Sequence, residues 1–112
     1  MGRLRTFKRG SISVLAVDDP LMDDAATSLR ETAEALLAEG SLQLVVDLGS
    51  VPFIDSSGLE TLLNLDARIR EAGGAFSLAS PNALCRDILK ATRLDKALLI
   101  HTTLDEASRS FL

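Results

Sequence analysis

The chain has 112 residues, of which 46% are hydrophobic and 25% charged, so it suits one globular domain, which we expect to span residues 1–112. A net charge of −4 and an aromatic content of only 4% oppose binding to nucleic acid or to an anionic membrane surface. No apolar stretch approaches the roughly 20 residues of a membrane span, and the single cysteine, Cys85, suits a reducing compartment, so we expect a cytoplasmic protein.

The first half of the chain predicts a hairpin, a helix and a buried strand. Two strand-like runs lie within residues 4–17, and the second is apolar on nearly both faces, which places it inside a sheet. The sequence Asp-Asp-Pro at residues 18–20 ends this run. Apolar side chains at three- and four-residue steps predict a helix over residues 23–39. The near-continuous apolar run of residues 42–48 predicts a strand that is buried on both faces.

Helices and strands continue to alternate in the second half. The elements expected there are, in chain order, a helix from Ser56 or Ser57 to Ala72, a strand over residues 75–79, a helix with its N-cap at Ser80 and a first-turn proline at Pro81, a strand over residues 97–101 and a closing helix over residues 104–111. This order predicts an α/β domain with a mixed sheet of four or five strands and about four helices packed mainly on one face.

Two hydroxyl groups and a carboxylate stand where an apolar connector meets the second helix. Asp55 or Ser56 can accept a hydrogen bond from an N–H group of the first helical turn. Ser57 together with Glu60 also spells a capping box, Ser-x-x-Glu. These residues therefore have a structural interpretation, in which they cap the helix.

The same residues suit a regulatory site. A serine in the first helical turn points its hydroxyl outward, and the helix N-terminus stabilises a phosphate group added there. Phosphorylation of Ser57 would bring about −1.5 to −2 charges to a small patch beside Asp55. Gly58 carries no side chain, so we expect it to leave room for the backbone of a docking partner. Asp55 can cap the helix while Ser57 is modified.

These residues resemble the STAS domain and, within it, the anti-sigma factor antagonists. The resemblance rests on the sequences Val45-Val46-Asp47-Leu48, Val51 to Leu59 with its Asp-Ser-Ser-Gly-Leu core, Gly73-Gly74 and the ending around Asp105-Glu106-Ala107. It covers almost the whole chain. Two positions depart from the family: Asp19-Pro20 stands where a glycine is frequent, and Thr92-Arg93-Leu94 stands where Thr-Gly-Leu is frequent.

The resemblance implies a phosphorylation switch and no enzyme activity or cofactor. The second serine of the pair is the usual phosphate acceptor in that family, which maps to Ser57, with Ser56 as second choice. The implied partner is an anti-sigma factor that is itself a serine kinase; it binds the unmodified chain, and a serine phosphatase resets the switch. Asp55, Ser56, Gly58 and the loop from Asp19 to Met22 would form the docking surface.

Two other functions fit the same fold. The chain could be a constitutive scaffold or a subunit, of a signalling complex or of a lipid-transport ATPase, in which Ser57 only caps the helix at about 1 kcal/mol. It could also sense a small ligand at the same edge of the sheet, although no motif specifies one. Phosphorylation separates the first alternative from the switch.

Other chemistry has weaker support. Asp18 and Asp19 with Asp47 and Lys96 resemble the acidic site of a response-regulator receiver, but a strand and a helix are missing between them. The chain has no Gly-x-Ser-x-Gly motif, which a serine hydrolase of the α/β class would need. We expect His101, the one histidine, at a surface or an edge. Neither a Walker loop nor a Gly-x-Gly-x-x-Gly loop is present.

Overall fold

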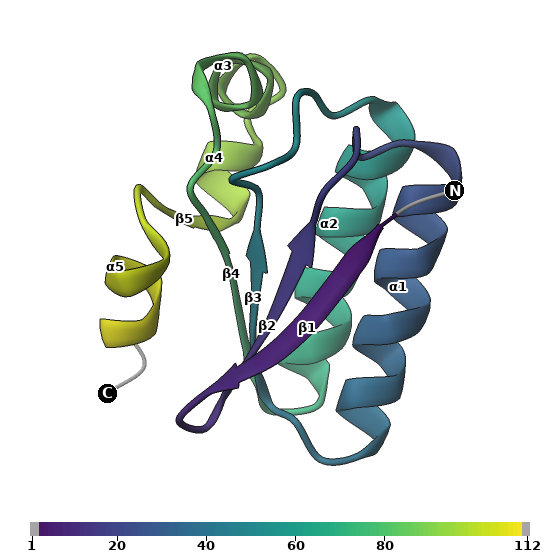
Figure 1. Cartoon of the computed structure of the whole chain (residues 1–112), viewed down its shortest axis with the longest axis vertical. Coiled ribbons are helices and arrows are strands. Elements are labelled where there is room, and N and C mark those ends of the chain that lie inside the picture. Colours follow the sequence, from purple (N-terminus) through teal and green to yellow (C-terminus); the bar gives the residue numbers. More distant parts are fainter. Residues whose placement is uncertain (1–2, 111–112) are drawn as a thin grey trace.

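The computed structural model describes residues 3–110 of the chain (Figure 1). They form a five-stranded sheet and five helices. In chain order the elements are β1 (Leu4–Arg9), β2 (Ile12–Val17), α1 (Asp23–Ala38), β3 (Gln43–Asp47), α2 (Ser56–Glu71), β4 (Ala75–Ala79), α3 (Ala83–Ala91), α4 (Leu94–Ala97), β5 (Leu99–His101) and α5 (Leu104–Arg109).

The sheet is mixed, with the strand order β1-β2-β3-β4-β5. β1 and β2 pair antiparallel through a tight turn in which Gly10 has a φ of 63°. The other neighbours, β2 with β3, β3 with β4 and β4 with β5, are parallel. The carboxyl ends of β2–β5 therefore share one edge of the sheet, and their amino ends share the opposite edge. The predicted α/β fold with a mixed sheet is confirmed.

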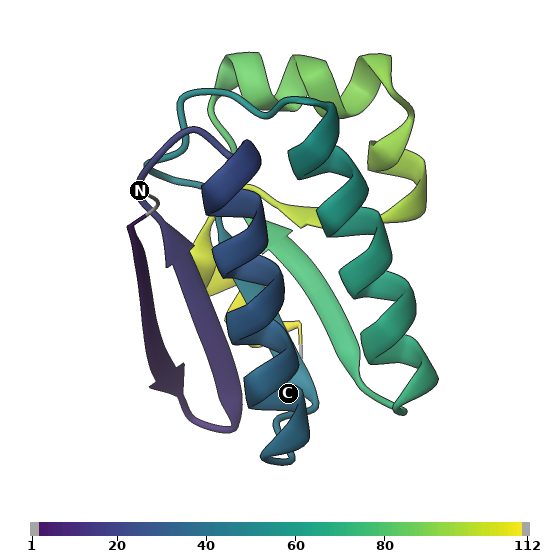
Figure 2. The same cartoon turned by 90° about the vertical axis from the view of Figure 1, so that its right-hand side faces the viewer.

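Helices cover both faces of the sheet, and one helix lies across an edge. α1 and α2 run side by side on one face, as Figure 2 shows, and enclose the larger aliphatic core. α5 lies on the other face over a smaller core of Ile12, Val14, Val45, Ala79 and Ala107. α3 lies across the carboxyl ends of the strands (Figures 1 and 2). Cys85 is buried in the larger core, as predicted for an inert thiol.

The prediction that Ser80 caps α3 is wrong. Ser80 has a φ of 60°, whereas an N-cap residue is extended, and its N–H donates to the carbonyl oxygen of His101 at 3.0 Å. Asn82 is the N-cap instead, and its side chain accepts a hydrogen bond from the N–H of Cys85 at 2.7 Å. Pro81 thus precedes the cap rather than following it.

The last predicted strand and helix are shorter than expected. Leu94–Ala97 forms the short helix α4, so the predicted strand of residues 97–101 begins only at Leu99. The closing helix ends at Arg109, and the last residue predicted for it, Phe111, lies outside the described residues.

Candidate functional site

Leu21 fastens the connector between β3 and α2 to the loop between β2 and α1. Its N–H donates to the carbonyl oxygen of Phe53 at 3.0 Å, and its carbonyl oxygen accepts from the N–H of Asp55 at 3.3 Å. Leu21 and Ile54 form an isolated parallel bridge, and both side chains are buried. The two loops that the sequence predicts to share one edge of the sheet are therefore joined by backbone hydrogen bonds.

α3 holds the other side of the same connector. The side-chain amide of Asn82 donates to the carbonyl oxygens of Val51 and Pro52 at 3.2 and 3.3 Å. The Cys85 thiol also donates to the Val51 oxygen at 3.3 Å, and burial raises the pKa of this thiol. The connector therefore enters α2 from a fixed position.

Asp55 is the N-cap of α2. Its backbone is extended, with φ −96° and ψ −175°, and its Oδ1 accepts a hydrogen bond from the N–H of Gly58 at 2.9 Å. Ser56 is consequently the first helical residue and Ser57 the second. The alternative in which Ser57 and Glu60 form a capping box is wrong, because the helix begins two residues too early for it.

The two serines occupy the positive end of α2. Ser56 is exposed and Ser57 half-buried, and no hydrogen bond within residues 3–110 involves the Ser57 hydroxyl. The N–H groups of the first helical turn have no acceptor inside the helix, and the helix dipole adds about half a positive charge there. The first turn contains no acidic residue. Negative groups are therefore favoured at this helix end, where the Asp55 carboxylate accepts the N–H of Gly58.

The interpretation of Gly58 as a gap for a partner is wrong. Gly58 is buried, and a Cβ atom there would lie 2.2 Å from the carbonyl oxygen of Leu21 and 2.8 Å from Cγ2 of Ile54. The glycine is needed because the first turn of α2 packs directly on the backbone of this chain's own β2–α1 loop. It supports the joint between the two loops from inside.

The two aspartates before α1 interact with the start of the chain, Asp18 with β1 and Asp19 with Arg3 just before it. Arg5 donates to both carboxylate oxygens of Asp18, at 2.7 and 3.0 Å, and the backbone N–H of Arg3 donates to Asp19 at 2.8 Å. The hydrogen bond from Arg5 holds the pKa of Asp18 below its ordinary value. Met22 is the N-cap of α1 and is half-buried, without a side-chain capping bond.

The connector that precedes the two serines in the sequence lines an open hollow and carries an exposed aromatic ring. The hollow has a volume of about 360 Å³ and is lined by Asp18, Pro20, Gly49, Ser50, Val51, Pro52 and Asn82. Phe53, two residues before the N-cap, is 37% exposed although it is aromatic. This end of the sheet therefore carries hydroxyl, carboxylate and exposed apolar groups.

The receiver interpretation is wrong. A receiver sheet has its first strand inside and runs in the order 2-1-3-4-5, whereas here β1 is an antiparallel edge strand. Asp47 accepts a bond from the N–H of Gly49 at 2.9 Å, and Asp18 pairs with Arg5. Lys96 belongs to α4 and not to the end of a strand. Within residues 3–110 there is no group of three or more His, Cys, Asp or Glu side chains that could hold a metal ion.

His101 has a structural partner. It lies on the edge strand β5, as predicted, although its side chain is only 13% exposed. Its Nδ1 is 3.3 Å from Oε1 of Glu106, and Glu106 also accepts bonds from the N–H and the hydroxyl of Thr102. These bonds from Thr102 chiefly hold the pKa of Glu106 below its ordinary value. The serine pair is not among the hydrogen-bond partners of the imidazole.

The sequence analysis missed the roles of two residues of the site, Leu21 and Asn82. Leu21 offers no local signal, because its role depends on contacts with residues more than 30 positions away. Asn82 did carry a signal, since asparagine is among the best N-cap residues, but Ser80 and Pro81 offered an equally good local pattern.

Comparison with known proteins agrees with this description. Residues 4–107 match the family model of the STAS domain. Over 74 residues the chain is 34% identical to a Thermotoga maritima protein named as a candidate anti-sigma factor antagonist; the match spans 66% of each chain, just under two thirds of the relative.

Solved structures share the fold. The crystal structure of a candidate anti-sigma factor antagonist from Thermotoga maritima has a TM-score of 0.89 and 26% identity, covering 96% of this chain and 92% of that chain. The anti-sigma factor antagonist SpoIIAA in its unphosphorylated form gives a TM-score of 0.80 at 19% identity, covering 99% and 96%. Phosphorylated SpoIIAA of Bacillus gives 0.73 at 18%, covering both chains fully.

No helix within residues 3–110 is both long enough and apolar enough to cross a membrane. The family match extends over both loops, the serine pair and the whole sheet. The chain therefore belongs to the STAS domain family.

Proposed function

We propose that this chain is an anti-sigma factor antagonist that binds an anti-sigma kinase while Ser57 is unmodified and releases it when Ser57 is phosphorylated. The observation that supports this most is the division of roles at the start of α2. Asp55 makes the capping bond, so the Ser57 hydroxyl is not needed for capping and lies at a helix end that favours phosphate.

The proposed docking surface is formed by the first turn of α2 and the loop before α1. It comprises Asp55, Ser56 and Ser57 with the loop from Asp19 to Met22. Phe53, whose carbonyl oxygen accepts from the Leu21 N–H, adds a partly exposed ring from the adjoining connector. Aromatic side chains frequently carry a large share of interface energy. Gly58 belongs to the interior of this surface and supports it without contacting the partner.

The energetics favour a switch of this kind. In the free protein the phosphate is solvated and lies at the positive end of α2, so modification costs the fold little. In a complex the same charge would be desolvated beside Asp55, with no basic residue in the first turn to pair with it. An unpaired buried charge costs about 3–5 kcal/mol. Changing the ratio of kinase-bound to free chain from 99:1 to 1:99 requires about 5.5 kcal/mol of binding free energy. One phosphate therefore supplies most of this free energy.

In this proposal the chain is a phosphate acceptor and not a catalyst. The Ser57 hydroxyl loses its proton as its oxygen bonds to the γ-phosphorus of ATP, and ADP leaves; ATP and the base belong to the partner. SpoIIAA, which shares the fold, has structures in both the phosphorylated and the unphosphorylated form. The cap made by Asp55 also weakens the scaffold alternative, because that alternative explains Ser57 as a capping residue.

The first experiment maps phosphate on the chain recovered from its native cells, by mass spectrometry of peptides with and without phosphatase treatment. We expect phosphate on Ser57. Phosphate on Ser56 alone would keep the switch and move its site. No phosphate under any growth condition would favour the constitutive scaffold or subunit.

The second experiment measures binding of an anti-sigma kinase purified from the same organism. Ser57→Ala should bind and resist release by ATP, and Ser57→Asp should bind much more weakly than the parent chain. Ser57→Asn is the matched control, because its side chain has the size of aspartate without the charge. If Ser57→Asp binds as tightly as the parent, expulsion by charge is the wrong mechanism.

A further inference from the structure

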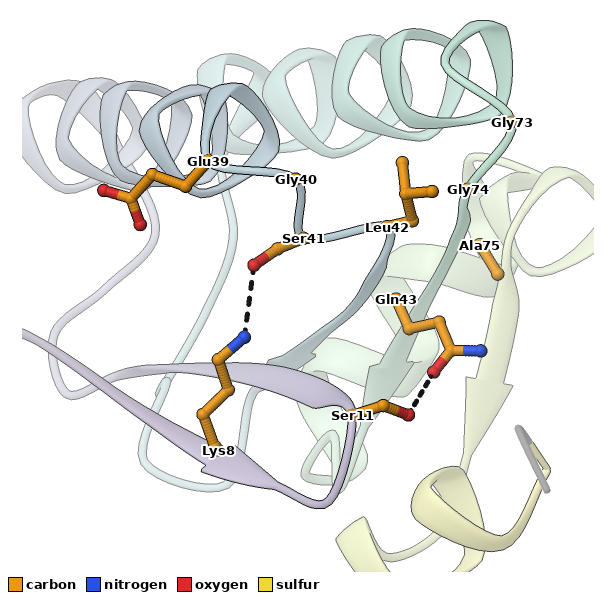
Figure 3. A pocket seen from close by; sticks show the side chains of 10 residues that line it. All are labelled: Lys8, Ser11, Glu39, Gly40, Ser41, Leu42, Gln43, Gly73, Gly74 and Ala75. Carbon is orange, nitrogen blue, oxygen red and sulfur yellow. Dashed lines mark hydrogen bonds between the residues drawn. The ribbon is translucent and has the colours of Figure 1, made fainter.

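A second pocket lies at the opposite end of the sheet from Ser57. It has a volume of about 560 Å³, within the usual range of small-molecule sites, and it opens between the β1–β2 turn, the α1–β3 loop and the α2–β4 loop (Figure 3). α2 spans the distance between the two ends: its 16 residues are about 24 Å long. The pocket is therefore separate from the proposed docking surface.

Glycines keep one side of this pocket open. α1 and α2 both end in a left-handed glycine, Gly40 with φ 96° and Gly73 with φ 84°, and an added Cβ atom at either would meet nothing within 4 Å. Next to Gly73, Gly74 packs its backbone against the carbonyl oxygen of Leu42, where a Cβ atom would lie only 2.3 Å away. The three glycines thus contribute only backbone to this side, next to the side chains of Leu42 and Ala75.

On the other side of the pocket, the Lys8 ammonium group is held by two serine hydroxyls. Lys8 Nζ donates to the Ser13 hydroxyl at 2.9 Å and to the Ser41 hydroxyl at 3.2 Å. Ser13 is only 2% exposed, so this anchor is held inside the protein. An ammonium group has three N–H donors, and the two serines account for two of them. No ion pair within residues 3–110 includes Lys8.

Neutral hydrogen-bonding groups complete the lining. The Ser11 hydroxyl is 2.8 Å from the side-chain oxygen of Gln43, which leaves the amide nitrogen of Gln43 free to donate. Glu39 also lines the pocket, and none of the ion pairs within residues 3–110 joins its carboxylate to Lys8. The carboxyl ends of α1 and α2 add partial negative charge on the glycine side. A negative group therefore fits against Lys8, and neutral hydroxyls fit against Ser11, Ser41 and Gln43.

We infer that this pocket binds a small hydroxylated organic anion, whose carboxylate or phosphate group contacts the Lys8 ammonium and whose hydroxyls pair with Ser11, Ser41 and Gln43. The site would give the chain a small-molecule ligand at the end remote from Ser57. This inference does not depend on the proposed switch, and either can fail alone.

The test follows backbone amide shifts of the full chain by NMR during titration with glycerate. We expect saturable shifts in the millimolar range at residues of the three loops, such as Gly10, Ser41 and Gly73, and none at Ser56 or Ser57. Acetate, which lacks the hydroxyls, and glycerol, which lacks the charge, should each bind at least about tenfold more weakly. Glycerol 3-phosphate shows whether the preferred charged group is phosphate or carboxylate.

Two variants test the residues. Lys8→Gln should weaken binding about ten- to a hundredfold, the usual effect of losing a charge-assisted hydrogen bond, and Lys90→Gln on the exposed face of α3 should leave it unchanged. If Lys8→Gln does not fold, Ser11→Ala in the exposed turn replaces it and should weaken binding severalfold. The inference is overturned if neither anion gives saturable shifts at tens of millimolar, if the shifts lie near Ser57, or if the variants bind like the parent.

Discussion

Gly58→Ala tests whether the glycine is needed for packing inside this chain or for contact with a partner. A methyl group at this position would lie 2.2 Å from the carbonyl oxygen of Leu21, 2.8 Å from Cγ2 of Ile54 and 3.0 Å from Cγ of Leu21. Contacts below 3.0 Å do not persist, so the first turn of α2 and the Leu21 backbone must separate by at least 0.8 Å. The obstacle is backbone, which has no alternative rotamer.

The expected loss of stability in Gly58→Ala is the difference between two opposing effects. Overpacking of a rigid site costs about 1–3 kcal/mol, and a backbone obstacle places this site at the upper end of that range. Alanine recovers at most about 1 kcal/mol through its better helix propensity. The free energy of unfolding should therefore fall by about 2 kcal/mol, and the Tm by roughly 8 °C for a domain of this size. The bond from Asp55 to Leu21 should weaken with it.

Urea unfolding of the parent chain, Gly58→Ala and Ser56→Ala measures this effect. Ser56 is exposed in the same helical turn, so its alanine variant should stay within about 0.5 kcal/mol of the parent. If Gly58→Ala is as stable as the parent but binds the kinase poorly, the glycine faces the partner and our account of its role is refuted.

Three further predictions concern the cap, the pH dependence and the exposed ring. Asp55→Ala should lower the free energy of unfolding by about 1 kcal/mol through loss of the cap, whereas Ser57→Ala should change it by less than about 0.5 kcal/mol; equal losses in urea unfolding would mean that Ser57 shares the capping role. Because the pKa of Asp18 is lowered in the folded chain, its contribution to stability is present above the ordinary carboxyl range and is lost as the pH falls from about 4 through the lowered folded pKa. Unfolding measured across that range should therefore show a shallower acid loss for Asp18→Asn, and identical curves would contradict this assignment. Phe53→Ala should weaken kinase binding about tenfold or more in calorimetry, whereas Phe7→Ala, at 39% exposure on β1 against 37% for Phe53, should not; equal effects would exclude Phe53 from the docking surface.

Local patterns in the sequence predicted most of the elements. The apolar steps over residues 23–39 correspond to α1, and the strand expected over residues 75–79 is β4 without a shift. Such patterns work because a helix or strand of this length buries one face or both, and burial selects residues at the matching period. α4 has four residues and is too short to show a period. It includes Ala97, where the last strand was expected to begin.

Two details of the site depended on where α2 begins. The sequence allowed Asp55, Ser56 or the pair of Ser57 and Glu60 to cap the helix, because each satisfies local capping rules. The choice of Asp55 is made by its N–H bond to Leu21 and by the close packing of Gly58 on the same residue. These contacts join segments more than 30 residues apart, which no local rule describes.

The α/β class, the aliphatic core and the position of the serine pair at a helix N-terminus were predictable from local patterns, because they follow from composition and from periods shorter than one element. Three features became visible only in the folded chain: Gly58 faces inward, Asn82 holds the connector before α2, and Lys8 contacts Ser13 and Ser41 beside the pocket. Each of these arises where loops from distant parts of the chain meet at an end of the sheet. Their meeting is set by strand order, which depends on packing between elements rather than on any one of them.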